Sequence, residues 1–260
     1  MLRFTSLGSG SSGNATVVEA RSGNGLPTRL LIDCGLRLKA LDARLKRAGL
    51  RADQLDAIFV THEHGDHIGC AHALSLRERI PVWMSHGTHA AIGTPDFDGL
   101  LQIASNGADI GIGELLVQPF TVPHDAREPL QLTCSDGAIR LGITTDLGHI
   151  TPRVLSALSG CAVLLLECNH DPDMLAASRY PAFLKNRVAG PYGHLANAVS
   201  AEIAQSVAGS GPLHRVVAAH LSKQNNHPDL VRETLVAALG CDPSDIGIAD
   251  AAQGYDWCDV

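Results

Sequence analysis

Three imidazoles and a carboxylate stand within a span of six residues, as His62, His64, Asp66 and His67. They directly follow the apolar run 55–61, which predicts a buried strand, so the group lies where a strand passes into a loop. Such a loop can bend so that the first two histidines face one point and the last two residues face another point close by. Imidazole nitrogen together with carboxylate oxygen suits Zn, Mn or Fe and does not suit Ca or Mg. The spacing therefore predicts a metal site, and the alternative is a polar loop that happens to be rich in histidine.

Five further apolar runs lead, like the run before His62, to a residue of a type that binds metals. These runs and the residues that follow them are 28–32 with Asp33, 115–123 with His124, 139–145 with Asp146, 163–167 with His170 and 215–219 with His220. Functional side chains of α/β proteins gather where the ends of several strands meet. Six endings of this kind therefore predict one shared site and are hard to explain by packing alone.

Helix-like segments separate these runs, at 36–49, 68–79, 197–209 and 228–239. Strands that alternate with helices indicate a layered α/β fold. Asn197 and Asp229 stand near the starts of the last two segments, where short polar side chains can cap a helix.

The composition fits an α/β protein with an aliphatic core. Of the 260 residues, 45% are hydrophobic but only 4% are aromatic, and this length is ordinary for one domain. The formal net charge of −7 argues against a broad basic surface, but it leaves a nuclease open because bound divalent metals add positive charge. Seven scattered cysteines without C-x-x-C spacing indicate reduced, mostly buried thiols. We see neither a signal peptide nor a membrane-spanning run, so we expect a soluble, cytoplasmic protein.

The pattern H-x-H-x-D-H after a strand, with His124, Asp146 and His220 at later strand ends, resembles the metallo-β-lactamase superfamily over essentially the whole chain. Four stretches further resemble its YycJ/WalJ-like subgroup, whose members are regarded as phosphodiesterases and DNA exonucleases. These stretches are 7–14, 167–171, 193–197 and 220–226. The resemblance implies a four-layer αββα sandwich, in which two mixed sheets pack face to face and helices cover the outer faces. It also implies a single domain over 1–260, with the metal site at one edge between the sheets.

The resemblance implies two divalent metal ions, Zn or Mn with Fe as a further option. One ion would take His62, His64 and His124, the other would take Asp66, His67 and His220, and Asp146 would bridge them. Two such ions can share a hydroxide and clamp the attacking and leaving oxygens of a phosphodiester. The implied activity is a dinuclear metal-dependent phosphodiesterase that uses a metal-bridging hydroxide, most simply a DNA exonuclease acting at the 5′ end. Asp33 would support the ligand loop by hydrogen bonds, and its alternative is a turn aspartate.

A glycine- and serine-rich loop follows the first strand-like segment and contains Ser9, Ser11, Ser12 and Asn14. Such a loop can present backbone N–H groups to a phosphate. It lacks the Gly-Lys-Ser/Thr ending of a Walker A loop, and a tight turn would explain its composition equally well. The resemblance favours a substrate-binding loop.

His194 follows a glycine and precedes the helix that starts near Asn197, where helix N–H groups favour an anion. It can bind the scissile phosphate or protonate the leaving oxygen, and its alternative is a surface or capping histidine. We expect His220 rather than His194 to complete the metal site, because a strand end is the more rigid position. His170 has a weaker claim to contact substrate, since support of a ligand or core packing would account for it as well. The expected catalytic residues are Asp33, Asp66 and His194.

The other histidines are expected at the surface or in local hydrogen bonds, although His149 follows Asp146 closely enough for a place near the pocket. They are His72, His86, His89, His149, His214 and His227.

A small-molecule hydrolase of the same fold, acting on a cyclic phosphate, thioester or lactone, is the main alternative. The phosphate-suited loop speaks against thioesters and lactones but leaves a cyclic phosphate open. Diiron oxidases of this fold usually carry Glu at the position of His64, and an inactive scaffold would be expected to have lost ligands. Hydrolysis is therefore preferred.

The short spacing between His124 and Asp146, and the lack of a long projecting arm, favour a DNA end over a folded RNA as substrate. We expect a nucleic-acid partner, with DNA favoured, and no membrane. The sequence leaves the oligomeric state open.

Overall fold

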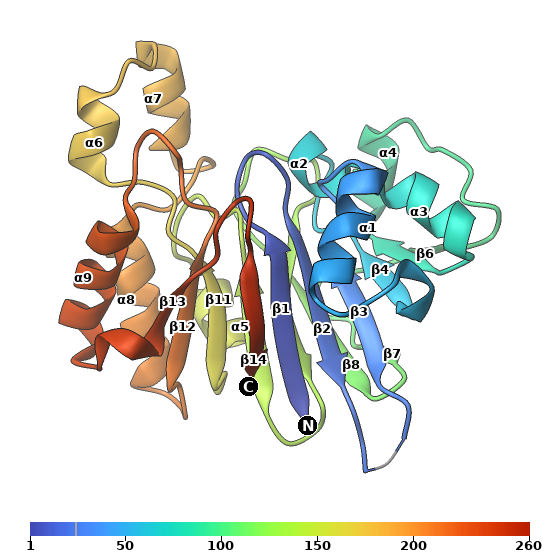
Figure 1. Cartoon of the computed structure of the whole chain (residues 1–260). Helices are drawn as coiled ribbons and strands as arrows, with labels where there is room; N and C mark the ends of the chain where they lie inside the picture. The colour runs from blue at the N-terminus through green and yellow to red at the C-terminus, as the bar shows by residue number, and fades with distance from the viewer. Residues whose placement is uncertain (24) are drawn as a thin grey trace.

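Two seven-stranded β-sheets pack face to face in the computed structural model, which describes residues 1–23 and 25–260 (Figure 1). The first sheet contains, in spatial order, β14 (Tyr255–Asp259), β1 (Leu2–Gly8), β2 (Ala15–Ala20), β3 (Thr28–Ile32), β4 (Ala57–Phe59), β5 (Val82–Met84) and β6 (Leu101–Ile103). The second contains β13 (Ile246–Ile248), β12 (Arg215–Ala219), β11 (Val163–Glu167), β10 (Arg140–Thr144), β9 (Leu130–Ser135), β8 (Leu115–Thr121) and β7 (Ile110–Ile112). Both sheets are mixed, because strands pair antiparallel in one half and parallel in the other.

Helices cover the outer face of each sheet, which confirms the expected four-layer αββα sandwich (Figure 1). Beside the first sheet lie α1 (Leu38–Arg47), α2 (Gly65–Ile68), α3 (Ala71–Glu78) and α4 (His86–Ala91). Beside the second lie α5 (Pro152–Leu158), α8 (Asn197–Ala208) and α9 (Pro228–Leu239). Short 3₁₀ turns span Ala52–Gln54 and Pro243–Asp245. None of the helices in the described part of the chain is long and apolar enough to cross a membrane.

Three apolar clusters hold these layers together. One lies between the sheets and includes Phe4 and Phe59, and the other two join each sheet to its own helices. In α1, Leu41 and Leu45 are four residues apart and therefore lie on one face of the helix, where both are fully buried. Burial of each such leucine contributes about 1.5–3 kcal/mol.

The strands that precede the predicted site residues agree closely with the apolar runs. The runs 28–32, 163–167 and 215–219 have the same bounds as β3, β11 and β12. Every residue of β11 is buried, as expected for a parallel strand that is covered on both faces. Because parallel strands end at the same edge of a sheet, β10, β11 and β12 deliver the residues that follow them to one place.

The two predicted helix caps are wrong. Helix α8 begins after Ala196 without a side-chain cap, because the Asn197 amide instead exchanges two hydrogen bonds of 2.9 Å with the Asn226 amide. Helix α9 is capped by His227, whose Nδ1 accepts a hydrogen bond from the Asp229 backbone N–H at 3.3 Å.

A pair of short helices, α6 (Pro172–Ala177) and α7 (Ala182–Val188), projects beyond the sheets between β11 and α8 (Figure 1). The helix-like segments expected from the sequence do not include this stretch. Asp171 caps α6 by accepting a hydrogen bond from the Met174 backbone N–H at 2.9 Å, and proline begins the helix. This pair of helices is thus a short projection from the sandwich.

Candidate metal centre

The loops that follow four strands meet at one edge of the sandwich. His62 to His67 follow β4, His124 follows β8, Asp146 follows β10, and His220 follows β12. The ligand-bearing atoms of these residues fall into overlapping groups whose members lie within 4.8 Å of one another. The predicted metal-binding residues are therefore brought together from both sheets.

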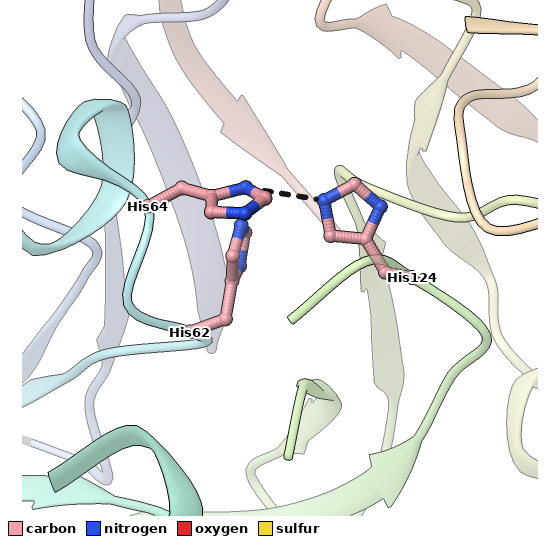
Figure 2. A group of neighbouring side chains, drawn as sticks. All are labelled: His62, His64 and His124. Atoms are coloured by element: carbon pink, nitrogen blue, oxygen red, sulfur yellow. Dashed lines mark hydrogen bonds between the residues drawn. The ribbon is translucent and has the colours of Figure 1, made fainter. Parts of the chain in front are cut away.

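The first group consists of His62, His64 and His124, whose rings converge from two loops (Figure 2). His124 Nδ1 donates to the Gly193 carbonyl at 3.1 Å, and His124 Nε2 faces His64 Nδ1 at 3.3 Å. His62 Nδ1 lies 3.0 Å from the Thr61 hydroxyl, while its Nε2 is buried without a hydrogen-bond partner. Each ring thus has one nitrogen turned into the group, as imidazoles that bind a metal do.

The second group consists of Asp66, His67 and His220. Asp66 Oδ2 lies 3.5 Å from His220 Nε2 and 3.8 Å from His67 Nε2. His220 Nε2 is buried and has no hydrogen bond of good geometry. A buried polar atom without a partner is unfavourable unless something binds it, so this set of nitrogen and oxygen atoms fits a cation.

Asp146 lies between the two groups and is buried. One carboxylate oxygen, Oδ2, lies 2.6 Å from His67 Nε2 and 3.4 Å from His62 Nε2. The other, Oδ1, lies 2.9 Å from His220 Nδ1 and 3.1 Å from His194 Nδ1. Burial alone would raise the pKa of Asp146, but the charges on His220 and His67 outweigh it and hold the pKa well below its usual range. The carboxylate is therefore an anion in contact with both groups.

Asp33 supports this centre from outside it. Its Oδ2 accepts a hydrogen bond from His67 Nδ1 at 2.7 Å, and its Oδ1 accepts one from the Thr61 backbone N–H at 2.9 Å. The first bond leaves His67 Nε2 to face Asp146. Although burial acts in the opposite direction, the carboxylates of Asp33 and Asp146 raise the pKa of His67 to about 10. Asp33 has a φ of 60°, a left-handed conformation that Asp tolerates better than most residues.

Glu167 is a residue of this site to which the sequence analysis gave no role. It is the last residue of β11 and is fully buried. Its Oε1 lies 2.8 Å from His194 Nδ1 and 3.3 Å from His220 Nδ1, and its Oε2 accepts from the Leu147 backbone N–H at 2.8 Å. One feature of the sequence could have indicated this role. Glu167 is a carboxylate at the end of an apolar run, and this run lies between the runs that lead to Asp146 and His220.

His194 points into the same cluster, and its side chain is 20% exposed. Burial alone would lower the pKa of His194, but the carboxylates of Glu167 and Asp146 raise it to about 9. Its Nδ1 is held by these two carboxylates, so its Nε2 is the nitrogen left for another group.

Asn14 and Ser9 of the glycine- and serine-rich loop are buried and hydrogen bonded to the centre itself. Asn14 Nδ2 lies 3.2 Å from the Asp66 carbonyl and 3.0 Å from His67 Nε2, and Ser9 Oγ accepts from the His220 backbone N–H at 2.8 Å. Through these contacts, the two side chains stabilise the loops that carry the candidate metal ligands. Ser11 and Ser12 are exposed at the tip of the loop.

His170 and Asn197 lie deeper in the protein. The His170 ring is buried with an unpartnered Nδ1, and its carbonyl accepts from the Asn197 backbone N–H at 2.9 Å. Because the Asn197 amide is fully engaged with Asn226, the structure does not turn it toward the metal centre.

Four of the other histidines make hydrogen bonds to the backbone, and one of them is His227, the cap of α9. His72, His89 and His149 have ring nitrogens 2.8, 3.1 and 2.7 Å from backbone carbonyls. The partner of His149 is the Pro191 carbonyl, three residues before His194 in the sequence.

The sequence matches a family model described as the metallo-beta-lactamase superfamily, over residues 8–153. Exodeoxyribonuclease YycJ of Bacillus anthracis is 32% identical over 259 residues, which cover 98% of this chain and 95% of the relative. Exodeoxyribonuclease WalJ of Streptococcus pneumoniae serotype 2 (strain D39) is 29% identical over 98% of this chain and 93% of the relative. The solved structure of the metallo-beta-lactamase fold protein YhfI from Bacillus subtilis has a TM-score of 0.76 at 16% identity, with both chains covered completely.

Proposed function

This chain belongs to the metallo-β-lactamase superfamily of metal-dependent hydrolases, and on that premise we propose that it is a dinuclear phosphodiesterase acting at an end of DNA. The observation that carries the dinuclear part is the position of Asp146, whose Oδ2 lies between His62 of the first group and His67 of the second. The DNA part is supported by the two exodeoxyribonucleases that resemble this chain over nearly its whole length.

We assign one cation, Zn or Mn, to the first histidine group and a second to the group of Asp66, His67 and His220, with Asp146 shared. Bound there, the cations would lower the pKa of water and neutralise negative charge on a phosphate. Asp33 holds His67 in the tautomer that leaves Nε2 free. The buried Asn14 fixes the loop that carries Asp66.

Glu167 and His194 are suited to handle the proton of the leaving group. The buried Glu167 carboxylate holds His194 Nδ1 at 2.8 Å and so fixes the orientation of the ring. His194 Nε2 then remains available to donate a proton to the oxygen that leaves when the phosphodiester breaks. Glu167 is a positioning residue in this arrangement.

The exposed serines at the tip of the first loop supply the proposed contact to a terminal phosphate. Ser11 and Ser12 lie between Gly10 and Gly13. These two glycines have φ values of 139° and 134°, respectively, which allow the chain to turn sharply there. The N–H groups of Gly10 and Gly13 already donate to Asn14 Oδ1 and to the Gly10 carbonyl, so we assign the contact with the phosphate to Ser11 and Ser12.

A panel of substrates tests the proposal. The purified enzyme, supplied separately with Mn and Zn, would be given 5′-phosphorylated and unphosphorylated DNA and RNA, 2′,3′-cyclic nucleotides and a generic phosphodiester. We expect 5′-phosphorylated DNA to give the highest kcat/KM, and Asp146→Asn serves as the inactive control for contaminating nucleases. A far higher kcat/KM for cyclic nucleotides than for any oligonucleotide would replace the DNA assignment with a small-molecule phosphodiesterase.

A further inference from the structure

The segment 172–192, which contains α6 and α7, projects beyond the two sheets (Figure 1). It begins shortly after Glu167 and ends just before His194. Helix α7 has no buried residue. Its position and exposure suit a surface that contacts something other than the rest of this chain.

Exposed aromatic side chains are confined to this segment in the part of the chain that the structure describes. Phe183 is 74% exposed and Tyr192 is 59% exposed, whereas the other aromatic residues are buried or half-buried. The whole chain has only ten phenylalanine, tyrosine and tryptophan residues, so two exposed rings within ten positions are a marked concentration. Large exposed rings commonly indicate a binding surface, and aromatic faces stack on unpaired nucleic-acid bases.

The charge of the segment also fits a nucleic acid. Segment 172–192 contains Arg179, Lys185 and Arg187 and one carboxylate, Asp173, although the chain as a whole has a net charge of −7. Arg179 is exposed, and the Arg187 side chain is 57% exposed even though its Nε pairs with Asp125 Oδ2 at 2.6 Å. Cations interleaved with aromatic rings match the alternating phosphates and bases of a single strand.

Hydrogen bonds connect the end of the segment to the metal centre. The Tyr192 carbonyl accepts from the Asp125 backbone N–H at 3.0 Å, and Asp125 directly follows the predicted ligand His124. The His194 backbone N–H donates to the Val188 carbonyl at 2.9 Å. The Tyr192 backbone therefore lies beside the residue that follows His124, and the Tyr192 ring centroid is 6.4 Å from that of His149.

We propose that segment 172–192 binds the single-stranded end of the substrate DNA, with Phe183 and Tyr192 stacking on bases and Arg179 and Lys185 contacting phosphates. The proposal rests on the proposed function and identifies the form of DNA that the site takes. A duplex hides the faces of its bases inside the stack, so this surface favours a single strand or a frayed end over blunt duplex.

Binding measurements test the surface separately from catalysis. The metal-loaded enzyme would be titrated into a fluorescent single-stranded oligonucleotide whose phosphorothioate linkages resist cleavage, and anisotropy would give the Kd. The double variant Phe183→Ala with Tyr192→Ala should raise the Kd at least about tenfold. The matched control is Ile103→Ala, which removes an exposed apolar side chain on β6, and it should leave the Kd unchanged.

The charged residues are tested in the same assay. Arg179→Gln with Lys185→Gln should weaken binding and lower the slope of log Kd against log salt concentration. Arg51→Gln removes a well-exposed arginine outside the segment and should change neither quantity.

The outcomes separate this inference from the proposed function. Loss of affinity in both double variants supports the surface even if the DNA-cleavage panel fails. Unchanged affinity in both double variants overturns the inference, even if the wild-type enzyme degrades DNA. A change in the oligomeric state of the aromatic double variant, measured by light scattering with unchanged DNA affinity, would assign the surface to a second copy of this chain and equally overturn the inference.

Discussion

The histidines of the two groups share one arrangement, in which the protein holds one ring nitrogen and leaves the other facing the group. Asp33 holds His67, the Gly193 carbonyl holds His124, and Glu167 holds His220. Such partners fix the tautomer and orientation of an imidazole before any ion arrives. The quality of the proposed metal site therefore depends on residues that would touch no metal.

Replacement of Asp33 tests this dependence. Asn fits the left-handed backbone at position 33, but its amide offers one acceptor oxygen where the carboxylate offers two to His67 and Thr61. Asp33→Asn should keep the fold, as judged by circular dichroism, and weaken metal binding about 10- to 100-fold in a chelator competition. Wild-type metal affinity in this variant would contradict the supporting role.

His194 and His220 should respond differently to removal, although both contact Asp146 and Glu167. Only His220 also lies in the group with Asp66 and His67. His220→Ala should lose one metal equivalent, whereas His194→Ala should keep both and lower kcat about 10²- to 10⁴-fold. Metal analysis of the two variants beside their kinetics makes the distinction. The reverse pattern of metal content would exchange the two roles.

At the scale of elements, close backbone contact holds in place the loop after β4, which carries Asp66. The loops after β1 and β3 pack against the loop after β4. The Asp66 carbonyl accepts from the Asn14 backbone N–H at 2.8 Å, and the Cys34 backbone N–H donates to the His67 carbonyl at 2.7 Å. Gly35 lies at the contact, and a Cβ there would be 1.7 Å from the Asp66 carbonyl oxygen. The loops can approach this closely only because position 35 has no side chain.

Gly35→Ala should therefore push the Asp66 loop away and lower metal affinity and activity together. Gly65→Ala is the matched control in the same loop, because a Cβ at position 65 meets no atom within 4 Å. Metal titration and circular dichroism of both variants provide the measurement. Equal metal affinity in the two would show that the close contact does not position Asp66.

Patterns among neighbouring residues in the sequence predicted strands and the candidate metal-binding residues at their ends. The runs before Asp33 and His220 have the bounds of β3 and β12, because a covered parallel strand is a continuous apolar run with a polar residue at its end. The order of strands in each sheet could not be predicted from such patterns, since it depends on pairing between distant segments. The two-sheet arrangement came from the family resemblance.

Other features could not be predicted because neighbouring residues in the sequence do not indicate them. Glu167 is part of an apolar run, and only the neighbouring strands reveal that its carboxylate reaches His194. Asn14 was assigned to substrate, but it is buried against Asp66 and His67, which lie more than fifty residues away. Helices α6 and α7 are short and largely exposed, so they lack the apolar periodicity that predicts longer helices.

At the scale of the whole molecule, the sandwich collects carboxylates from both sheets at one edge. Asp33, Asp66, Asp146 and Glu167 lie around the same histidines. So much negative charge in a buried place is favourable only with positive charge beside it. Bound cations should therefore stabilise the whole fold as well as supply chemistry.

Metal removal tests this link to stability. An ion that binds only the folded state adds about 2.7 kcal/mol when its free concentration is 100 times Kd. The Tm from scanning calorimetry should accordingly fall when the loaded enzyme is treated with a chelator and recover on addition of Mn or Zn. Asp146→Asn should show a much smaller difference between the two states. An equal Tm with and without metal in the wild type would contradict the coupling.

The number of metal ions per chain tests the central claim most directly. The enzyme would be reconstituted with excess Mn or Zn, freed of loosely bound ions, and measured by inductively coupled plasma mass spectrometry alongside its activity. Because Asp146 lies between two sets of ligand atoms, we expect a metal content that approaches two equivalents per chain. We also expect the activity to rise as the second equivalent binds. Full phosphodiesterase activity at a single equivalent under saturating metal would contradict the dinuclear account.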